Sequence, residues 1–180
     1  NLDDPKITKI QLTRSVGISI ATQTGIEAAH GDFIALMDHD DMLAPDALEK
    51  VVKVIDEYGS DLIYTDEAVF SDLTKGRVAG YFGVPHLKPD FSPDLFLCHN
   101  YITHLVVFRK EIIERVEGFR AEFDGAQDYD FLLRLTEQTD RIFHISEPLY
   151  YWRQSAQSTS LDTGAKPLAH LRGQKALSEA

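Results

Sequence analysis

The apolar residues in the first part of the chain follow two alternating spacings. Those of residues 15–29 share one helical face, and a His-Gly pair then ends the pattern. An unbroken apolar stretch at residues 33–37 predicts a buried strand. Helical spacing returns over residues 45–58 until Gly59, and residues 62–64 are typical of another short strand. This alternation predicts an α/β fold, in which a mostly parallel but mixed sheet is flanked by helices and binds ligands at the carboxyl ends of its strands.

The rest of the chain predicts further helices and strands, separated by a loop rich in Gly and Pro. In chain order we expect a loop with a short hairpin (72–93), a helix (95–99), a strand (105–108), an amphipathic helix (127–138), two closing strands (142–145 and 149–152) and a polar helix from 164 onward. We therefore expect one domain over residues 1–160 and a C-terminal helical extension over residues 161–180.

The start of the chain carries an isolated strand pattern. Apolar and polar residues alternate over residues 7–12, which predicts a half-buried strand. Strands of a parallel sheet have partners on both sides, and no strand is expected before this one. We therefore expect that the front of a larger domain is missing.

Composition and charge narrow the classes of partner. The 180 residues are 43% hydrophobic, which is enough for the core of one domain. The formal net charge of -11 gives no electrostatic support for sequence-independent binding to nucleic acid or to an anionic bilayer. An anionic ligand would need help from a metal. A single cysteine, Cys98, and the lack of a signal peptide or long apolar stretch predict a reducing, cytoplasmic location.

Four polar residues, Asp38-His39-Asp40-Asp41, end the apolar stretch at 33–37. Crowded carboxylates repel one another unless something positive lies between them, and Mg²⁺ and Mn²⁺ prefer such oxygen ligands. Asp38 and Asp40 are two residues apart, so an extended strand would point both the same way. In the alternative interpretation Asp41 caps the helix that starts near Pro45 and the other acids are solvated.

A second acidic cluster begins the helix expected over residues 127–138. A carboxylate at a helix N-terminus stays ionised, as a general base near a hydroxyl must be, and this suits Asp128. The neighbouring Gly125 would allow a close approach of a ligand. The alternative role for Asp128 is capping of the helix.

Several segments, taken together and in order, carry a resemblance to a known family. They are Gly17–Ala21, Gly25–Asp41, Pro45–Leu48, Tyr64–Glu67, Lys88–Leu95, Gly118–Arg120, Gly125–Asp130 and Leu149–Arg153. The combination resembles the inverting family 2 glycosyltransferases of the GT-A fold. It is most similar to the branch that builds bacterial surface polysaccharides, including rhamnosyltransferase-like members.

The resemblance implies a role for each matching residue. Asp38 would contact the donor ribose, and Asp40, together with Asp38, would ligate the Mn²⁺ or Mg²⁺ that bridges the nucleotide diphosphate. Asp128 would be the base that deprotonates the acceptor hydroxyl. Gln127 and Trp152-Arg153 would bind the donor and line the acceptor and diphosphate side. The implied reaction is a single in-line displacement with inversion, from a nucleoside-diphosphate sugar to a glycan or lipid-linked acceptor.

Five polar residues are weaker candidates for the acceptor side. They are Asp66, Glu67, His99, Asn100 and His104, and each has a structural role as its alternative. The resemblance also allows peripheral association of the full-length enzyme with the inner face of the membrane, and it leaves the oligomeric state open.

The sequence departs from the family pattern in three places. Thr22-Gln23 stands where Arg-Asn is common, and Tyr151 stands where His is frequent. The segments that match the family begin only at Gly17, so we expect that the first strand, helix and strand of such domains, which bind the nucleotide base, are missing. An alternative function is therefore a non-catalytic GT-A-like fragment that binds carbohydrate or acts as a scaffold.

Overall fold

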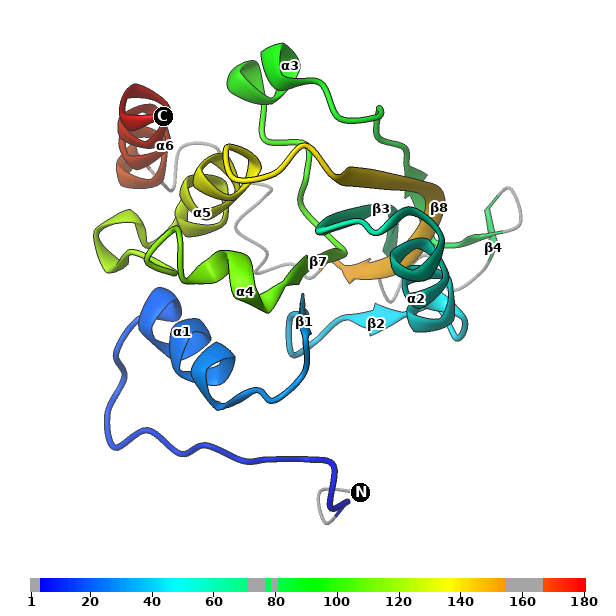
Figure 1. Cartoon of the computed structure of the whole chain (residues 1–180), viewed down its shortest axis with the longest axis horizontal. Helices are drawn as coiled ribbons and strands as arrows, with labels where there is room; N and C mark the ends of the chain where they lie inside the picture. Colours follow the sequence, from blue (N-terminus) through cyan, green and yellow to red (C-terminus); the bar gives the residue numbers. More distant parts are fainter. Residues whose placement is uncertain (1–3, 71–76, 79–80, 155–166) are drawn as a thin grey trace.

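A computed structural model describes residues 4–70, 77–78, 81–154 and 167–180 (Figure 1). The helices are α1 (Ile18–Ala28), α2 (Ala47–Tyr58), α3 (Pro93–Cys98), α4 (Lys110–Ile113), α5 (Gln127–Thr136) and α6 (Pro167–Glu179), with a 3₁₀ turn η1 (Ala121–Phe123). The strands are β1 (Phe33–Leu36), β2 (Met42–Leu43), β3 (Leu62–Phe70), β4 (Arg77–Val78), β5 (Tyr81–Phe82), β6 (Val84–His86), β7 (Val106–Arg109) and β8 (Ile142–Arg153).

The main sheet is mixed, which confirms the predicted α/β class. Its strand order is β1-β7-β3-β8-β2, and β6 pairs with β3. Only β3 and β8 pair in parallel within the described part of this sheet, while the other ladders are antiparallel. The parallel share is therefore smaller than the sequence pattern indicated. The reason is that β7, which is placed between β1 and β3, runs against both of them.

Alternate residues of the central strands feed two hydrophobic clusters on opposite faces of the sheet. Leu62 and Tyr64 of β3 pack in one cluster with residues of α1, α3, α4, α5 and α6, whereas Ile63 packs in the other with α2. Val107 of β7 joins the α2 side, and its neighbours Val106 and Phe108 join the opposite side. Because strand side chains alternate between faces, one buried apolar run supplies both cores.

Most predicted elements are present with shifted ends. The helix over 45–58 begins at Ala47 as α2 and ends at Gly59, whose left-handed backbone forms the C-cap. The hairpin expected within 72–93 is formed by β4 and β5. The two closing strands are one strand, β8, that pairs with β3 through a register shift beside Asp66.

The predicted strand over residues 7–12 is wrong. This segment forms no ladder with any described strand, and Ile7, Ile10 and Leu12 are all exposed. It runs as irregular chain outside the sheet (Figure 1). Alternation alone does not make a strand, because the backbone also needs a neighbouring edge for its hydrogen bonds.

The C-terminal segment lies against the rest of the structure. Helix α6 contacts α5 and η1, and Ala176 is buried there. Residues 164–166, where the sequence predicts the start of this helix, lie outside the described residues. Within the described ranges, no helix has the length and apolar character needed to cross a bilayer.

Candidate active site

The acidic loop, residues 37–41, joins β1 to β2 and is fastened to β8. The hydroxyl of Tyr150 donates to Asp41 Oδ2 at 2.6 Å and accepts from the backbone N–H of Asp38 at 3.1 Å. The backbone N–H of Arg153 donates to Asp41 Oδ1 at 2.7 Å, and its Nε donates to the carbonyl of Asp40 at 2.8 Å. The loop therefore takes its shape from β8, more than a hundred residues away in the chain.

The alternative role of Asp41 as a helix cap is wrong. Helix α2 has Asp46 at its N-cap, and no side chain forms a capping hydrogen bond there. Asp41 is instead buried, and both of its carboxylate oxygens accept hydrogen bonds from β8. Local sequence favours capping, whereas the loop turns the side chain toward a distant strand.

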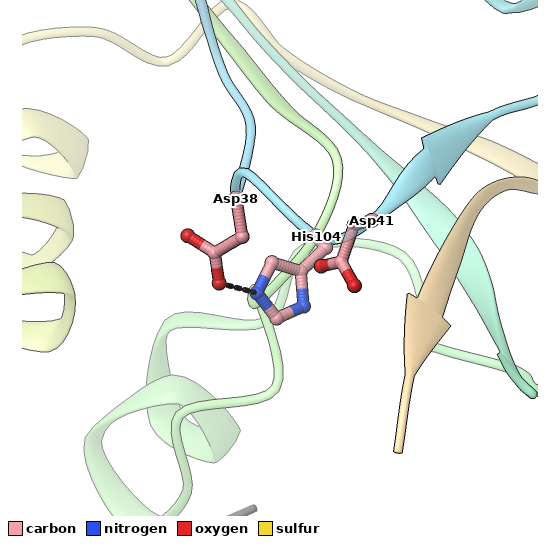
Figure 2. A group of neighbouring side chains, drawn as sticks. All are labelled: Asp38, Asp41 and His104. Carbon is pink, nitrogen blue, oxygen red and sulfur yellow. Dashed lines mark ion pairs between the residues drawn. The ribbon is translucent and has the colours of Figure 1, made fainter. Parts of the chain in front are cut away.

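The side chains of Asp38, Asp41 and His104 gather at this loop (Figure 2). One ligand atom of each lies within 4.8 Å of the others, and His104 Nε2 is 3.9 Å from Asp38 Oδ2. Two carboxylates and an imidazole are suitable ligands for Mn²⁺. Asp40 does not belong to this group, and its carboxylate lies 3.8 Å from the imidazole of exposed His39. Its metal role stays a prediction.

A buried carboxylate, Glu67, lies behind His104. Its Oε2 is 3.2 Å from His104 Nδ1, 3.2 Å from Lys88 Nζ and 2.8 Å from the Thr103 hydroxyl that donates to it. Burial alone would raise the pKa of Glu67, but the hydrogen bond from His104 and the charge of Lys88 outweigh burial and hold this pKa well below its ordinary value. The carboxylate therefore stays ionised inside the fold.

A cleft of about 520 Å³ extends from the acidic loop between α1 and β1 to the start of α5. Asp38, His104, Gln127 and Asp128 line it, together with apolar residues of α1 and β1. The structure thus brings Asp38 together with Gln127 and Asp128, and it places His104, which the sequence analysis assigned to the acceptor side, beside Asp38. The volume of the cleft lies within the usual range of small-molecule sites.

Asp128 is the second residue of α5. The N-cap of this helix is Ala126, and no side chain caps it, so the alternative capping role of Asp128 is not observed. The negative charge still lies in the first turn, where the helix dipole favours it. Gly125, at φ 98°, donates its N–H to Gln127 Oε1 at 2.6 Å. This bond holds the Gln127 side chain against the backbone just before α5.

The remaining candidates divide into two groups. Arg153 of β8 bonds to the acidic loop, and the indole ring of Trp152 lies 5.9 Å from the His104 ring. Asp66, His99 and Asn100 do not line the cleft among the described residues. Asp66 is 2% exposed and accepts from the N–H of Lys88 at 2.8 Å, which is a bond inside the fold. The acceptor roles of these three stay predictions.

Tyr150 is a site residue that the sequence analysis did not single out. Tyr150 lies in an apolar stretch that is typical of a buried strand, and its side chain is fully buried. Burial, together with the hydrogen bond to Asp41, raises its pKa well above the ordinary value for tyrosine. The hydroxyl therefore stays protonated and able to donate. No local signal distinguishes such a tyrosine from a core aromatic residue.

We expect Tyr150→Phe to cost about 1–3 kcal/mol of unfolding free energy, because it leaves buried Asp41 and the Asp38 N–H short of a partner. The variant should also bind Mn²⁺ more weakly than the wild type. Urea denaturation and Mn²⁺ titration measure the two effects. Tyr101→Phe is the matched control, because the Tyr101 hydroxyl bonds to both backbone groups of Ser92 and not to the acidic loop. A Tyr150→Phe protein with unchanged Mn²⁺ affinity would contradict the loop-holding role.

Comparison with known sequences identifies relatives along most of the chain. The sequence profile of the family described as Glycosyl transferase family 2 matches residues 1–117. An uncharacterized protein, y4gI of Sinorhizobium fredii (strain NBRC 101917 / NGR234), is 42% identical over 98% of this chain and 19% of its own length. The O-antigen biosynthesis protein RfbC of Myxococcus xanthus is 38% identical over 88% of this chain and 12% of its own length. The chain thus spans less than a fifth of these relatives.

Solved structures share the fold at low sequence identity. The mannosyltransferase PcManGT from Pyrobaculum calidifontis, in complex with GDP-Man and Mn²⁺, has a TM-score of 0.57 and 17% identity, and the match covers 84% of this chain and 40% of that one. S. aureus TarS 1-349 in complex with UDP-GlcNAc has a TM-score of 0.58 and 20% identity, with 77% and 39% covered. These likenesses support the GT-A type of α/β fold.

Proposed function

Because the chain belongs to glycosyl transferase family 2, we propose that it forms the metal and acceptor part of an enzyme that moves a sugar from a nucleoside-diphosphate donor, with inversion, to a hydroxyl of a glycan or lipid-linked acceptor. The observation that carries this proposal is the shared cleft, in which Asp38 and His104 lie at one end and Asp128 at another. The two ends offer the two functions that the reaction needs, charge neutralisation and proton removal.

Asp38 and Asp41 would hold a divalent cation, with Asp40 as the neighbouring candidate from the sequence. Their hard oxygen atoms fit Mn²⁺ or Mg²⁺, and Asp41 is already held in place by Tyr150 and Arg153. A bound cation would neutralise the charge that develops on the departing diphosphate. The protein itself carries a net charge of -11, so the same cation would also explain how it could tolerate a negatively charged donor.

Asp128 would act on the acceptor. Its carboxylate takes the proton of the attacking hydroxyl while the new C–O bond forms at the anomeric carbon and the bond to the diphosphate breaks. One displacement of this kind inverts the anomeric centre without a covalent intermediate. Gln127 would orient a substrate oxygen beside it, and Trp152 would cover the donor side of the loop.

The biological process that we propose is surface polysaccharide synthesis. The relative from Myxococcus xanthus is named as an O-antigen biosynthesis protein. A relative from Rhizobium meliloti (strain 1021), which is 30% identical, is named as a succinoglycan biosynthesis protein. A hexosyl or rhamnosyl donor and a cytoplasmic site of action fit this process.

The experiment that tests the proposal is calorimetry of the full-length protein carrying this chain, with UDP-GlcNAc and GDP-Man as probe donors. We expect at least one donor to bind in the presence of Mn²⁺. EDTA should weaken that binding by about 10-fold or more, because without the cation the diphosphate meets only carboxylates. NMR of the product anomeric proton tests inversion. Donor binding that is indifferent to EDTA would overturn the metal-assisted reaction, and glycan binding without donor binding would favour the non-catalytic alternative.

A further inference from the structure

The His104 ring lies between two sets of acidic groups. Its Nδ1 is 3.2 Å from Glu67 Oε2, and its Nε2 is 3.9 Å from Asp38 Oδ2 on the cleft side. An ionised carboxylate has no proton to donate, so the short contact with Glu67 requires the proton on Nδ1. In the neutral ring, the lone pair of Nε2 then faces Asp38. Figure 2 shows the ring in this position between the two aspartates.

Glu67 is held rigidly in its place behind the ring. Its side chain is 3% exposed, and Lys88, with a fully buried side chain, pairs with the same oxygen that His104 contacts. Lys88 Nζ also donates to the backbone carbonyl of His104. The orientation of His104 is thus built into the interior of the fold, where the cost of moving either charge is high.

The ring itself has little freedom to turn. It stacks on Tyr150 with centroids 4.8 Å apart and planes inclined by 15°, and the Trp152 ring covers it at 5.9 Å. The same Tyr150 donates to Asp41. One buried tyrosine therefore holds both the loop and the imidazole in place, and their ligand atoms lie within 4.8 Å of one another.

We propose that His104 is a nitrogen ligand of the cation at the acidic loop, and that Glu67 is a positioning residue that turns His104 Nε2 toward it. This inference rests on the proposed function, because it names a further ligand of the same cation. Histidines that bind metals donate their other ring N–H to a carboxylate or carbonyl, which is the arrangement seen between His104 and Glu67. A nitrogen ligand favours Mn²⁺ over Mg²⁺, so His104 also makes the site selective.

The test is titration of the full-length protein with Mn²⁺ alone, followed by the EPR signal of the free ion, with Mg²⁺ as competitor. His104→Phe keeps a flat ring against Tyr150 but removes both nitrogens. We expect it to weaken Mn²⁺ binding about 10- to 100-fold and to weaken Mg²⁺ binding much less. His86→Phe is the matched control, because His86 Nδ1 also contacts Glu67, at 3.1 Å on Oε1, but this half-exposed ring does not belong to the Asp38 group. Its Mn²⁺ affinity should equal that of the wild type.

The positioning role of Glu67 has its own measurements. Glu67→Gln should weaken Mn²⁺ binding about 10- to 100-fold. Because this variant leaves buried Lys88 without its charge partner and can fail to fold, the long-range ¹H–¹⁵N spectrum of wild-type protein provides a second readout. We expect it to show His104 protonated at Nδ1 and bare at Nε2, with Mn²⁺ broadening this ring before any other histidine. The opposite tautomer would overturn the role of Glu67.

The outcomes separate this inference from the proposed function. Equal Mn²⁺ affinity in the wild type and His104→Phe, or equal losses in His104→Phe and His86→Phe, would overturn the ligand assignment even when EDTA abolishes donor binding. A wild type that binds no Mn²⁺ would overturn it as well. Selective loss in His104→Phe, combined with donor binding that ignores EDTA, would support the ligand and contradict the metal-assisted transfer.

Discussion

Replacing Asp128 with asparagine is expected to lower the rate of sugar transfer by about 10²- to 10⁴-fold, the usual contribution of a general base. The side chain lines the cleft in the first turn of α5, and no side chain caps that helix. An amide has nearly the same shape but cannot take the proton of the acceptor hydroxyl. The donor and Mn²⁺ should bind with unchanged affinity, because the proposed metal ligands come from the acidic loop and β7 side of the cleft. Initial rates and calorimetry measure the two quantities.

Glu122→Gln is the matched control for loss of one negative charge. Glu122 is exposed in η1, just before α5, and lies outside the cleft lining. We expect this variant to keep the wild-type rate. An Asp128→Asn enzyme that turns over at the wild-type rate would remove Asp128 from the reaction, while parallel losses in both variants would show that general charge, and not proton transfer, sets the rate.

The second large effect is on stability, at Asp130. This aspartate is 1% exposed and is paired by Arg120 and by Arg134, whose Nη2 lies 2.6 Å from Asp130 Oδ2. Asp130→Ala would remove the carboxylate that pairs with Arg120 and Arg134, and it would leave two largely buried guanidinium groups without this negative partner. We expect it to lower the unfolding free energy by about 3–5 kcal/mol, a large part of the stability of a typical domain. Urea and thermal denaturation measure the change.

The matched control for this prediction lies two residues before Asp130. Asp128→Asn should change the unfolding free energy by less than about 0.5 kcal/mol, as is usual for a substitution that breaks no buried pair. The two acidic residues of one helical turn are thus expected to separate catalysis from folding. An Asp130→Ala protein as stable as the wild type would show that Arg120 and Arg134 find other partners, such as Glu179, which pairs with Arg120 at 2.8 Å.

Local patterns in the sequence were sufficient for most elements. Helical spacing predicted α2 and α5, and the Gly59 stop lies where the left-handed C-cap forms. The pattern failed at residues 7–12, where alternation met no partner edge. It also overstated the parallel share of the sheet, because strand direction depends on which strand a chain returns to and leaves no mark in the spacing of apolar residues.

The candidate site divides in the same way. Sequence alone determined which acids stand at element ends, Asp38 after a strand and Asp128 at a helix start, because burial and helix initiation are encoded by neighbouring residues. Only the tertiary structure decided that Asp41 faces Tyr150 and that His104 joins the acidic loop with Glu67 behind it. The partners in the Asp41–Tyr150 contact are 109 positions apart in the chain, and those in the Glu67–His104 contact are 37 positions apart. Packing of the sheet brings them together, and the local spacing of residues does not encode that packing.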